Sequence, residues 1–325
     1  MTTIRSVLRG TGMYLPERVI ENTWFEDRLD TTDEWIRSRS GIERRHFAAE
    51  DQPTSDLALR AARAALDRAG LTADEVDGIV LATSTPDFTF PAVATIVQAG
   101  LGMKGGFAYD VQAVCAGFVF ALANADAMIR AGLANRVLVI GAETFSRIMD
   151  WTDRSTCVLF GDGAGAVVLE AQPGAGTSAD RGILASDLHS DGKYRDLLYV
   201  DGGVSTTGTA GHLRMQGNLV FRHAVEKLAA TAHAALEKAG LQTSDVDWLV
   251  PHQANQRIIT ATAQRMGLPM EKVVLTVADH GNTSAASIPL ALAVADAEGR
   301  LKPGDVVVTE AIGGGLSWGS VVLRW

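Results

Sequence analysis

The chain is poor in cysteine. Cys115 and Cys157 are the only two among its 325 residues. Two cysteines cannot form a disulfide framework, and their separation lacks the paired spacing of a zinc site. The seven histidines are also scattered, so we expect no metal.

Positive charge is scarce as well. The chain has 29 Lys and Arg against 38 Asp and Glu, a net charge of −9. Nucleic-acid binding needs a basic surface to neutralise phosphates, so we expect no nucleic-acid partner, although a local basic patch for an acidic partner is compatible with this balance. No apolar run reaches the roughly 20 residues of a membrane span, and none near Met1 is typical of a secretory signal. The expected location is the reducing cytoplasm, away from any membrane.

The most informative positive feature is an internal repeat. The segment ALANADA at 121–127 recurs as ALAVADA at 291–297, a shift of 291 − 121 = 170 positions. The same shift carries 64–71 onto 234–241 and 76–80 onto 246–250. Three matches at one offset predict two copies of one module.

The copies divide the chain into an N-terminal half, 1–171, and a C-terminal half, 213–325. Residues 172–212, rich in Gly, Ser, Thr and Asp, are expected to be an inserted connection. Helical spacing of apolar residues over 57–69 precedes a short apolar run at 79–82. Alternation of such elements predicts an α/β fold with mostly parallel sheets covered by helices.

Cys115 lies between an extended segment and an Ala-rich helix, among small residues. A helix N-terminus stabilises a thiolate, which favours a nucleophile here. The alternative is a small buried hydrophobic residue, which is the commoner role of a lone cysteine. The second copy has Ala285 at this position and Asn282 close by.

Three further features stand where reactive groups are common. His252 follows the strand 248–250, at the carboxyl end where α/β folds place functional side chains, although it could equally be a packed histidine. Asn282 suits a catalytic amide, a turn or a helix cap. The glycines at 313–315 suit either an oxyanion donor or a tight turn between strands.

Together these motifs are far more specific than any one alone. In order they are Cys-Ala-Gly at 115–117, Pro-His-Gln-Ala-Asn at 251–255, His-Gly-Asn-Thr-Ser-Ala-Ala-Ser at 280–287 and Gly-Gly-Gly-x-x-Trp-Gly at 313–319. From Thr11 to its C-terminus the chain resembles the β-ketoacyl-acyl-carrier-protein synthase III family. The resemblance implies a thiolase-like fold, two similar halves in a five-layer αβαβα arrangement, in a homodimer.

The resemblance also implies the initiating condensing reaction of type II fatty-acid biosynthesis. A short acyl group, expected to be acetyl, passes from acyl-coenzyme A to Cys115. Malonyl-acyl carrier protein then loses carbon dioxide, and its carbanion attacks the acyl-enzyme to give a 3-oxoacyl product. His252 and Asn282 would stabilise the enolate, while the backbone N–H groups of Cys115 and Gly314 would hold the other oxyanion. This chemistry requires no metal or redox cofactor.

The family pattern assigns binding residues too. Those expected to bind coenzyme A are Trp35, Arg39 and Arg154. Those expected to bind the carrier protein are Arg222, Gln253, Arg257 and Arg265. Those expected to line the acyl pocket are Phe90, Phe145, Phe160 and Met215, with Phe90 reaching the pocket of the partner subunit. Ordinary core packing and a solvated charged face are the alternatives for these residues.

Three other functions fit parts of the pattern. A related acyl-cysteine transferase of secondary metabolism would use another acceptor. A catalytically idle protein would bind the thioester without turnover. A cysteine hydrolase would release the acyl group to water.

Overall fold

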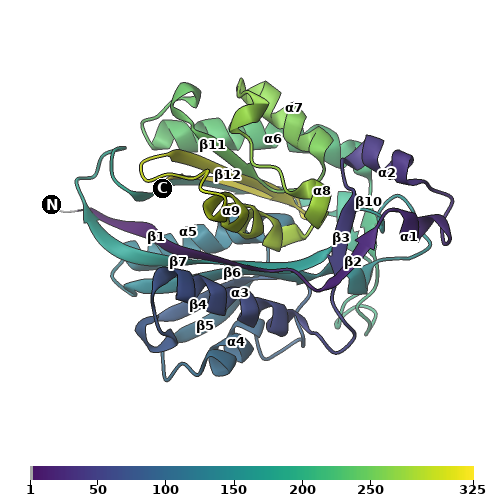
Figure 1. Cartoon of the computed structure of the whole chain (residues 1–325), viewed down its shortest axis with the longest axis horizontal. Coiled ribbons are helices and arrows are strands. Elements are labelled where there is room, and N and C mark those ends of the chain that lie inside the picture. The colour runs from purple at the N-terminus through teal and green to yellow at the C-terminus, as the bar shows by residue number, and fades with distance from the viewer. Residues whose placement is uncertain (1–2) are drawn as a thin grey trace.

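The computed structural model describes residues 3–325 and contains two main sheets, one in each half of the chain (Figure 1). The first sheet has the strand order β1-β7-β6-β4-β5. Its strands are β1 (Thr3–Tyr14), β4 (Gly78–Ala82), β5 (Phe107–Val111), β6 (Arg136–Thr144) and β7 (Asp162–Gly174). β4 is parallel to both β5 and β6, while β7 runs antiparallel to β1 and β6.

The second sheet has the strand order β11-β12-β13-β8. Its strands are β8 (Gly182–Ser190), β11 (Trp248–Pro251), β12 (Val306–Gly313) and β13 (Ser317–Arg324). Only β11 and β12 pair in parallel. The prediction of mostly parallel sheets is therefore wrong. Three residues connect β12 to β13, which is too short for a crossover and forces an antiparallel pair.

Helices form the remaining three layers of the fold. Between the sheets lie α5 (Gly117–Arg130) and α9 (Ser287–Ala297), whose apolar side chains share one core with both sheets (Figure 1). The outer face of the first sheet is covered by α3 (Thr54–Ala69) and α4 (Val93–Leu101). The outer face of the second is covered by α6 (Gly217–Lys238) and α7 (Gln256–Met266). The five-layer αβαβα fold expected from the resemblance is confirmed.

The repeat is visible in the elements themselves. The 3-10 turn η2 (Val114–Ala116) and helix α5 are followed 170 positions later by η7 (Ser284–Ala286) and α9, since 284 − 114 = 170 and 287 − 117 = 170. β6 and β12 begin at the same spacing, 306 − 136 = 170. Because the two middle helices are equivalent and face each other, the turns that begin them meet at the centre of the molecule.

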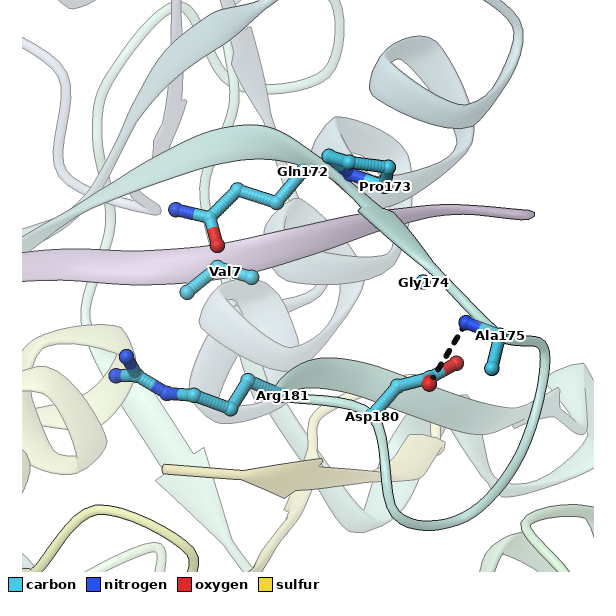
Figure 2. Close-up of a pocket in the computed structure, with 7 residues that line it drawn as sticks. All are labelled: Val7, Gln172, Pro173, Gly174, Ala175, Asp180 and Arg181. Atoms are coloured by element: carbon cyan, nitrogen blue, oxygen red, sulfur yellow. Dashed lines mark hydrogen bonds between the residues drawn. The ribbon is translucent and has the colours of Figure 1, made fainter. Parts of the chain in front are cut away.

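The segment 172–212 is more than an inserted connection. It contains β8, which pairs with β13 and occupies the edge of the second sheet, as β1 does in the first. The short link from β7 to β8 is held by Asp180, whose carboxylate accepts the N–H of Ala175 at 2.9 Å (Figure 2). A shallow pocket of about 460 Å³ lies beside this link.

Smaller elements complete the chain. They are the paired strands β2 (Arg18–Glu21) and β3 (Arg44–Phe47), the paired strands β9 (Leu198–Val200) and β10 (Leu213–Met215), and the helices α1 (Thr23–Glu26), α2 (Asp33–Ser40) and α8 (Val277–His280). None of the helices in the described residues has the length and apolar character needed to cross a membrane.

Candidate active site

The two central turns pack in a crossed manner, each against a strand of the opposite half. β12 contacts η2, and β6 contacts η7. A Cβ atom on Gly313 would lie only 2.7 Å from the backbone nitrogen of Cys115, and one on Gly141 only 2.2 Å from the carbonyl oxygen of Ala285. Glycine therefore permits both close approaches. This packing of each turn on the opposite half brings Cys115 close to residues 282–287.

Cys115, His252 and Asn282 line one narrow cavity of about 50 Å³. The three side chains are 4%, 5% and 6% exposed. The remaining wall of the cavity is mostly apolar, and its two further polar residues are Asn255 and Glu310. The apolar residues are Leu159, Phe160, Leu198, Met215, Val220, Leu228, Ala254, Ile258, Ile259 and Ile312. The volume exceeds that of one water and suits a group of only a few atoms.

Burial opposes ionisation of the Cys115 thiol. Burial raises the pKa of Cys115 to about 12, and the Ser284 hydroxyl beside it only partly opposes this shift. Removal from water therefore opposes the thiolate stabilisation expected from the helix N-terminus, and a nucleophilic Cys115 stays a prediction.

His252 is neutral, and its hydrogen bonds indicate which nitrogen carries the proton. Burial lowers the pKa of His252 to about 3. Its Nδ1 lies 2.7 Å from the Ser287 hydroxyl, which also accepts the N–H of Gln253 at 3.3 Å. The Ser287 hydrogen is then available to Nδ1, so we assign the ring proton to Nε2, as a donor.

The Asn282 side chain is oriented by its own turn. Its Oδ1 accepts the backbone N–H of Ser284 at 2.9 Å, which leaves the amide NH₂ available as a donor. Its backbone N–H donates to the carbonyl oxygen of Leu159 at 2.9 Å. His252 and Asn282 thus present neutral N–H groups, which suits stabilisation of a developing oxyanion.

Two buried glutamates lie near these groups and differ in their partners. Glu143 accepts hydrogen bonds from Thr85, Ser84, Thr83 and Ser284, and burial raises its pKa to about 7. Glu310 lines the cavity, and burial alone raises its pKa to about 8. Neither residue was found by sequence reasoning, although an acid at the end of the apolar strand Val306–Thr309 is an unusual signal.

The expected acyl-pocket residues are split between two spaces. Phe160 and Met215 line the cavity of Cys115, whereas Phe145 lines a neighbouring groove of about 780 Å³ and stacks on Phe160 with ring centroids 5.1 Å apart. Gly314 also lies in this groove, in the turn between β12 and β13, and does not line the cavity. Phe90 is 83% exposed and lines neither space.

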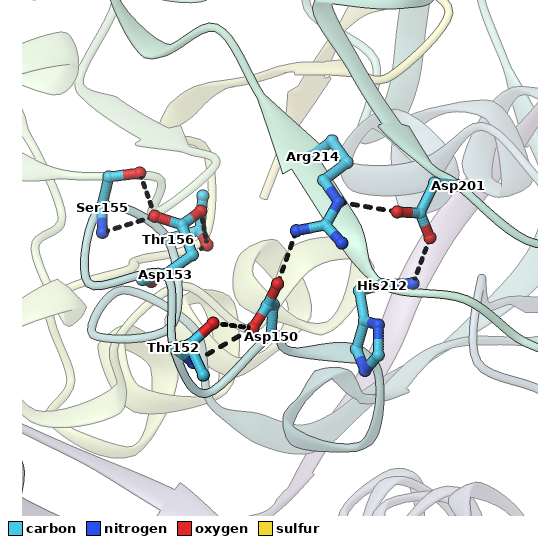
Figure 3. Close-up of polar contacts among 8 residues, drawn as sticks. All are labelled: Asp150, Thr152, Asp153, Ser155, Thr156, Asp201, His212 and Arg214. Atoms are coloured by element: carbon cyan, nitrogen blue, oxygen red, sulfur yellow. Dashed lines mark hydrogen bonds and ion pairs between the residues drawn. The ribbon is translucent and has the colours of Figure 1, made fainter. Parts of the chain in front are cut away.

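The three residues expected to bind coenzyme A meet at the surface. The guanidinium carbons of Arg39 and Arg154 lie 4.8 Å and 5.2 Å from the ring centroid of Trp35. The turn that carries Arg154 is held by Asp150, which accepts the N–H of Thr152 at 3.1 Å (Figure 3).

Arg214 ties this turn to the β9–β10 pair. Its guanidinium bonds Asp150 at 2.6 Å and Asp201 at 2.7 Å (Figure 3). The Thr152 hydroxyl and Arg214 lower the pKa of Asp150, so this carboxylate stays ionised. The turn beside the coenzyme A residues is therefore anchored to the second half.

The expected carrier-protein residues do not all reach the surface. Arg222 on α6 and the pair Arg257 and Arg265 on α7 are exposed. Gln253 is fully buried, and its amide bonds the backbone of Pro251, Val274, Thr276 and Val277. Its assignment to the carrier-protein surface is wrong, because all of its polar atoms are used to join β11 to the segment before α8.

Sequence reasoning also missed Ser284 and Ser287, which orient Asn282 and His252. The signal was present, since both belong to the motif at 280–287, but serine near a helix start is usually a cap. Within residues 3–325 no group of three or more His, Cys, Asp and Glu side chains is arranged to hold a metal ion.

Comparison with known proteins agrees with this geometry. Residues 109–192 match the family model of 3-oxoacyl-[acyl-carrier-protein (ACP)] synthase III, and residues 236–325 match the model of its C-terminal part. The chain is 80% identical over 321 residues to beta-ketoacyl-[acyl-carrier-protein] synthase III of Paracoccus denitrificans, covering 99% of each chain.

Solved structures match over the whole fold. The 3-oxoacyl-(acyl carrier protein) synthase III of Pseudomonas aeruginosa is 49% identical, with a TM-score of 0.91 and coverage of 99% of this chain and 98% of that one. The synthase III of Aquifex aeolicus is 45% identical, with a TM-score of 0.92 and coverage of 98% and 100%. The chain therefore belongs to the 3-oxoacyl-[acyl-carrier-protein] synthase III family of condensing enzymes.

Proposed function

We propose that Cys115 takes a short acyl group from acyl-coenzyme A and passes it to malonyl-acyl carrier protein, with His252 and Asn282 as oxyanion donors. This is the initiating condensation of fatty-acid biosynthesis, the activity of the family. The observation that carries the residue roles is that one thiol and two neutral N–H donors line a single buried cavity. A different acceptor is disfavoured, because a relative that is 80% identical over 99% of both chains is named beta-ketoacyl-[acyl-carrier-protein] synthase III.

The two half-reactions use the cavity differently. In acyl transfer the Cys115 sulfur attacks the thioester carbon, and the acyl group becomes a thioester of the enzyme. In condensation the malonyl group loses carbon dioxide, and negative charge develops on its thioester oxygen. The Nε2–H of His252 and the NH₂ of Asn282 would stabilise that charge without being deprotonated themselves.

The cavity supports a short primer. A volume of about 50 Å³ beside Cys115 accommodates an acetyl-sized group and leaves little room for a longer chain. Phe160 and Met215 are among the large side chains that line it. We propose acetyl-coenzyme A as the primer.

Surface residues around the site support binding of coenzyme A and of the acyl carrier protein. Trp35 offers an indole face, with the guanidinium groups of Arg39 and Arg154 within 5.2 Å of the ring centroid. These groups can stack on an adenine and bind phosphates. Arg222, Arg257 and Arg265 would form the basic surface for an acidic carrier protein, despite the overall charge of −9.

A homodimer is proposed from the exposed apolar residues near the groove. Phe88, Phe90 and Val204 are 60%, 83% and 73% exposed, and Phe88 and Val204 line the groove itself. Large apolar side chains gathered on one surface are typical of a protein interface. Phe90 would then reach toward the partner's site.

The test is intact-mass spectrometry after mixing with acetyl-coenzyme A. The wild type is expected to gain one acetyl group for each chain, and Cys115→Ala none. Ala285 occupies the equivalent position in the second half, so the alanine fits the turn and the variant should fold. Labelling of Cys115→Ala at the wild-type level would remove Cys115 as the nucleophile.

A further inference from the structure

A buried carboxyl group of the first half reaches the turn that carries Asn282 in the second half. Glu143 lies near the end of β6 and is fully buried. Its Oε1 accepts the hydroxyl hydrogen of Ser284 at 3.1 Å, and the backbone N–H of Ser284 donates to the Oδ1 of Asn282 at 2.9 Å. Two hydrogen bonds therefore join Glu143 to the side chain of a proposed oxyanion donor.

The other oxygen of Glu143 is anchored in the first half. Its Oε2 accepts the backbone N–H of Ser84 at 3.0 Å and the hydroxyl hydrogens of Thr83 and Thr85. A buried carboxyl group costs free energy unless hydrogen bonds satisfy it, and here both oxygens are used. Of the four hydrogen bonds that this group accepts within residues 3–325, one crosses to the second half. The first half therefore fixes the carboxyl group to which the Ser284 hydroxyl binds.

The internal repeat shows that such a link is not needed to pack a turn on a strand. Val114 is equivalent to Ser284, since 284 − 114 = 170, and Gly313 is equivalent to Glu143, since 313 − 143 = 170. Val114 has the same φ of 49° as Ser284 but an apolar side chain, and Gly313 has no side chain. The other turn thus packs on its strand without a carboxyl group. The hydroxyl–carboxyl link is present at the junction that carries Asn282.

We propose that Glu143 is a positioning residue for condensation, which acts through the Ser284 hydroxyl to direct the Asn282 amide toward the thioester oxygen of the malonyl group. The proposal rests on the role of Asn282 as an oxyanion donor given above. A donor stabilises developing charge best when it is already oriented, because no reorganisation is then required. With Oδ1 fixed by the Ser284 N–H, the NH₂ group of Asn282 is directed away from that bond.

The experiment must separate the two half-reactions, because the Ser284 hydroxyl also lies beside Cys115. Enzyme that has been acetylated in advance is mixed with malonyl-acyl carrier protein at several concentrations, and carbon dioxide release is followed. Acylation by acetyl-coenzyme A is measured separately by intact mass.

Glu143→Ala and Ser284→Ala each remove the link and leave the Asn282 side chain in place. The maximal rate of condensation should fall about tenfold in each variant, which corresponds to one hydrogen bond. The half-saturating concentration of malonyl-acyl carrier protein should not change, because the exposed arginines are intact. Acylation should stay within about threefold of the wild-type rate. The double variant should condense no more slowly than Glu143→Ala, since both changes break the same link.

Glu143→Gln is the conservative variant. The glutamine oxygen can accept the donors of residues 83–85, and its NH₂ group can donate to the Ser284 hydroxyl oxygen, so the link persists without a charge. Glu143→Gln should therefore recover most of the condensation rate that Glu143→Ala loses. Rescue of this kind distinguishes positioning from a direct effect of the charge.

Asp126→Ala is the matched control. Asp126 is also a buried carboxyl group that accepts a serine hydroxyl, that of Ser6 at 2.7 Å, and it lies outside the cavity. Its loss should leave the condensation rate of the folded enzyme at the wild-type value. A slow Asp126→Ala would overturn the proposal, because it would show that any buried carboxyl group of this kind affects condensation.

Three other results would overturn the proposal. They are a condensation rate within about threefold of wild type in Ser284→Ala, a Glu143→Gln variant as slow as Glu143→Ala, and a Ser284→Ala variant that is slow in acylation instead of condensation. If Glu143→Ala does not fold, Ser284→Ala and Glu143→Gln decide the question. Normal condensation by Asn282→Ala would defeat the proposed function itself, whereas normal condensation by Glu143→Ala beside a slow Asn282→Ala would defeat only this inference.

Discussion

The turns that begin α5 and α9 have the same backbone but different chemistry. Val114 and Ser284, the first residues of η2 and η7, both have a φ of 49°. The next residue is Cys115 in one half and Ala285 in the other, and both are buried. A duplicated backbone therefore holds the proposed nucleophile in the first half, and in the second it holds Ser284 and Ser287, which bond the proposed oxyanion donors Asn282 and His252.

One site arises from two copies of a module because the turn of each half packs on a strand of the other half. η2 packs on β12 of the second half, and η7 packs on β6 of the first. The first half contributes Cys115 to the cavity, and the second contributes His252, Asn282 and Glu310. Neither half contains all four groups.

The largest expected effect is a loss of condensation rate when either proposed oxyanion donor of the second half is removed. His252→Ala and Asn282→Ala should slow condensation with malonyl-acyl carrier protein by about 100- to 1,000-fold each, because each removes an oxyanion donor. Acylation by acetyl-coenzyme A should persist in both variants, since the thiol is intact. Carbon dioxide release and intact mass measure the two steps. Unchanged condensation in both variants would contradict the assigned roles.

The crossed packing can be broken from either side with one methyl group. Gly313→Ala places a Cβ 2.7 Å from the Cys115 nitrogen, and Gly141→Ala places one 2.2 Å from the Ala285 oxygen. Each should destabilise the protein by about 1–3 kcal/mol, as overpacking does. Gly313→Ala should also slow acylation, because it displaces Cys115. Urea unfolding measures the stability, with Gly105→Ala as an exposed control, because a Cβ there meets no atom within 4 Å and the backbone is not in the positive-φ region. Stability equal to wild type in both junction variants would show that the turns are not tightly packed.

Ser287 tests whether the second half orients His252. Ser287→Ala removes the partner of Nδ1 and should slow condensation by about tenfold, which corresponds to one neutral hydrogen bond. Acylation should be unaffected. Ser287→Thr keeps the hydroxyl and should restore most of the rate. A condensation rate that does not change in Ser287→Ala would mean that the ring is oriented by other contacts.

The smallest expected effect is a difference in stability between variants of the two turn residues that have a positive φ. Val114→Gly and Ser284→Gly each relieve a positive φ that costs a side chain of order 1–3 kcal/mol. Ser284→Gly additionally removes a donor to Glu143, 3.1 Å away. Val114→Gly should therefore be the more stable variant by about 1 kcal/mol. Thermal unfolding of the pair decides this, and the reverse order would contradict it.

Much of the fold and part of the site could be predicted from the chain. The offset of 170 positions located equivalent elements, and the periodicity of apolar residues identified the helices and buried strands that form the layers. The motifs around Cys115, His252 and Asn282 identified three groups that do line one cavity. The direction of β13 was missed, because the turn after β12 decides it, and β8 was missed within a polar segment.

The sequence alone determined the duplication, because the repeat at an offset of 170 positions can be read without any structure, and its resemblance to the family implied the layers and the reactive groups. Only the tertiary structure decided their chemical state. The pKa of Cys115 and the pKa of Glu310 are raised by burial, which residues distant in the chain create. The family pattern assigned Gln253 to the carrier-protein surface, yet hydrogen bonds to residues more than 20 positions away place it in the interior. Solvent exclusion is a property of the packed molecule.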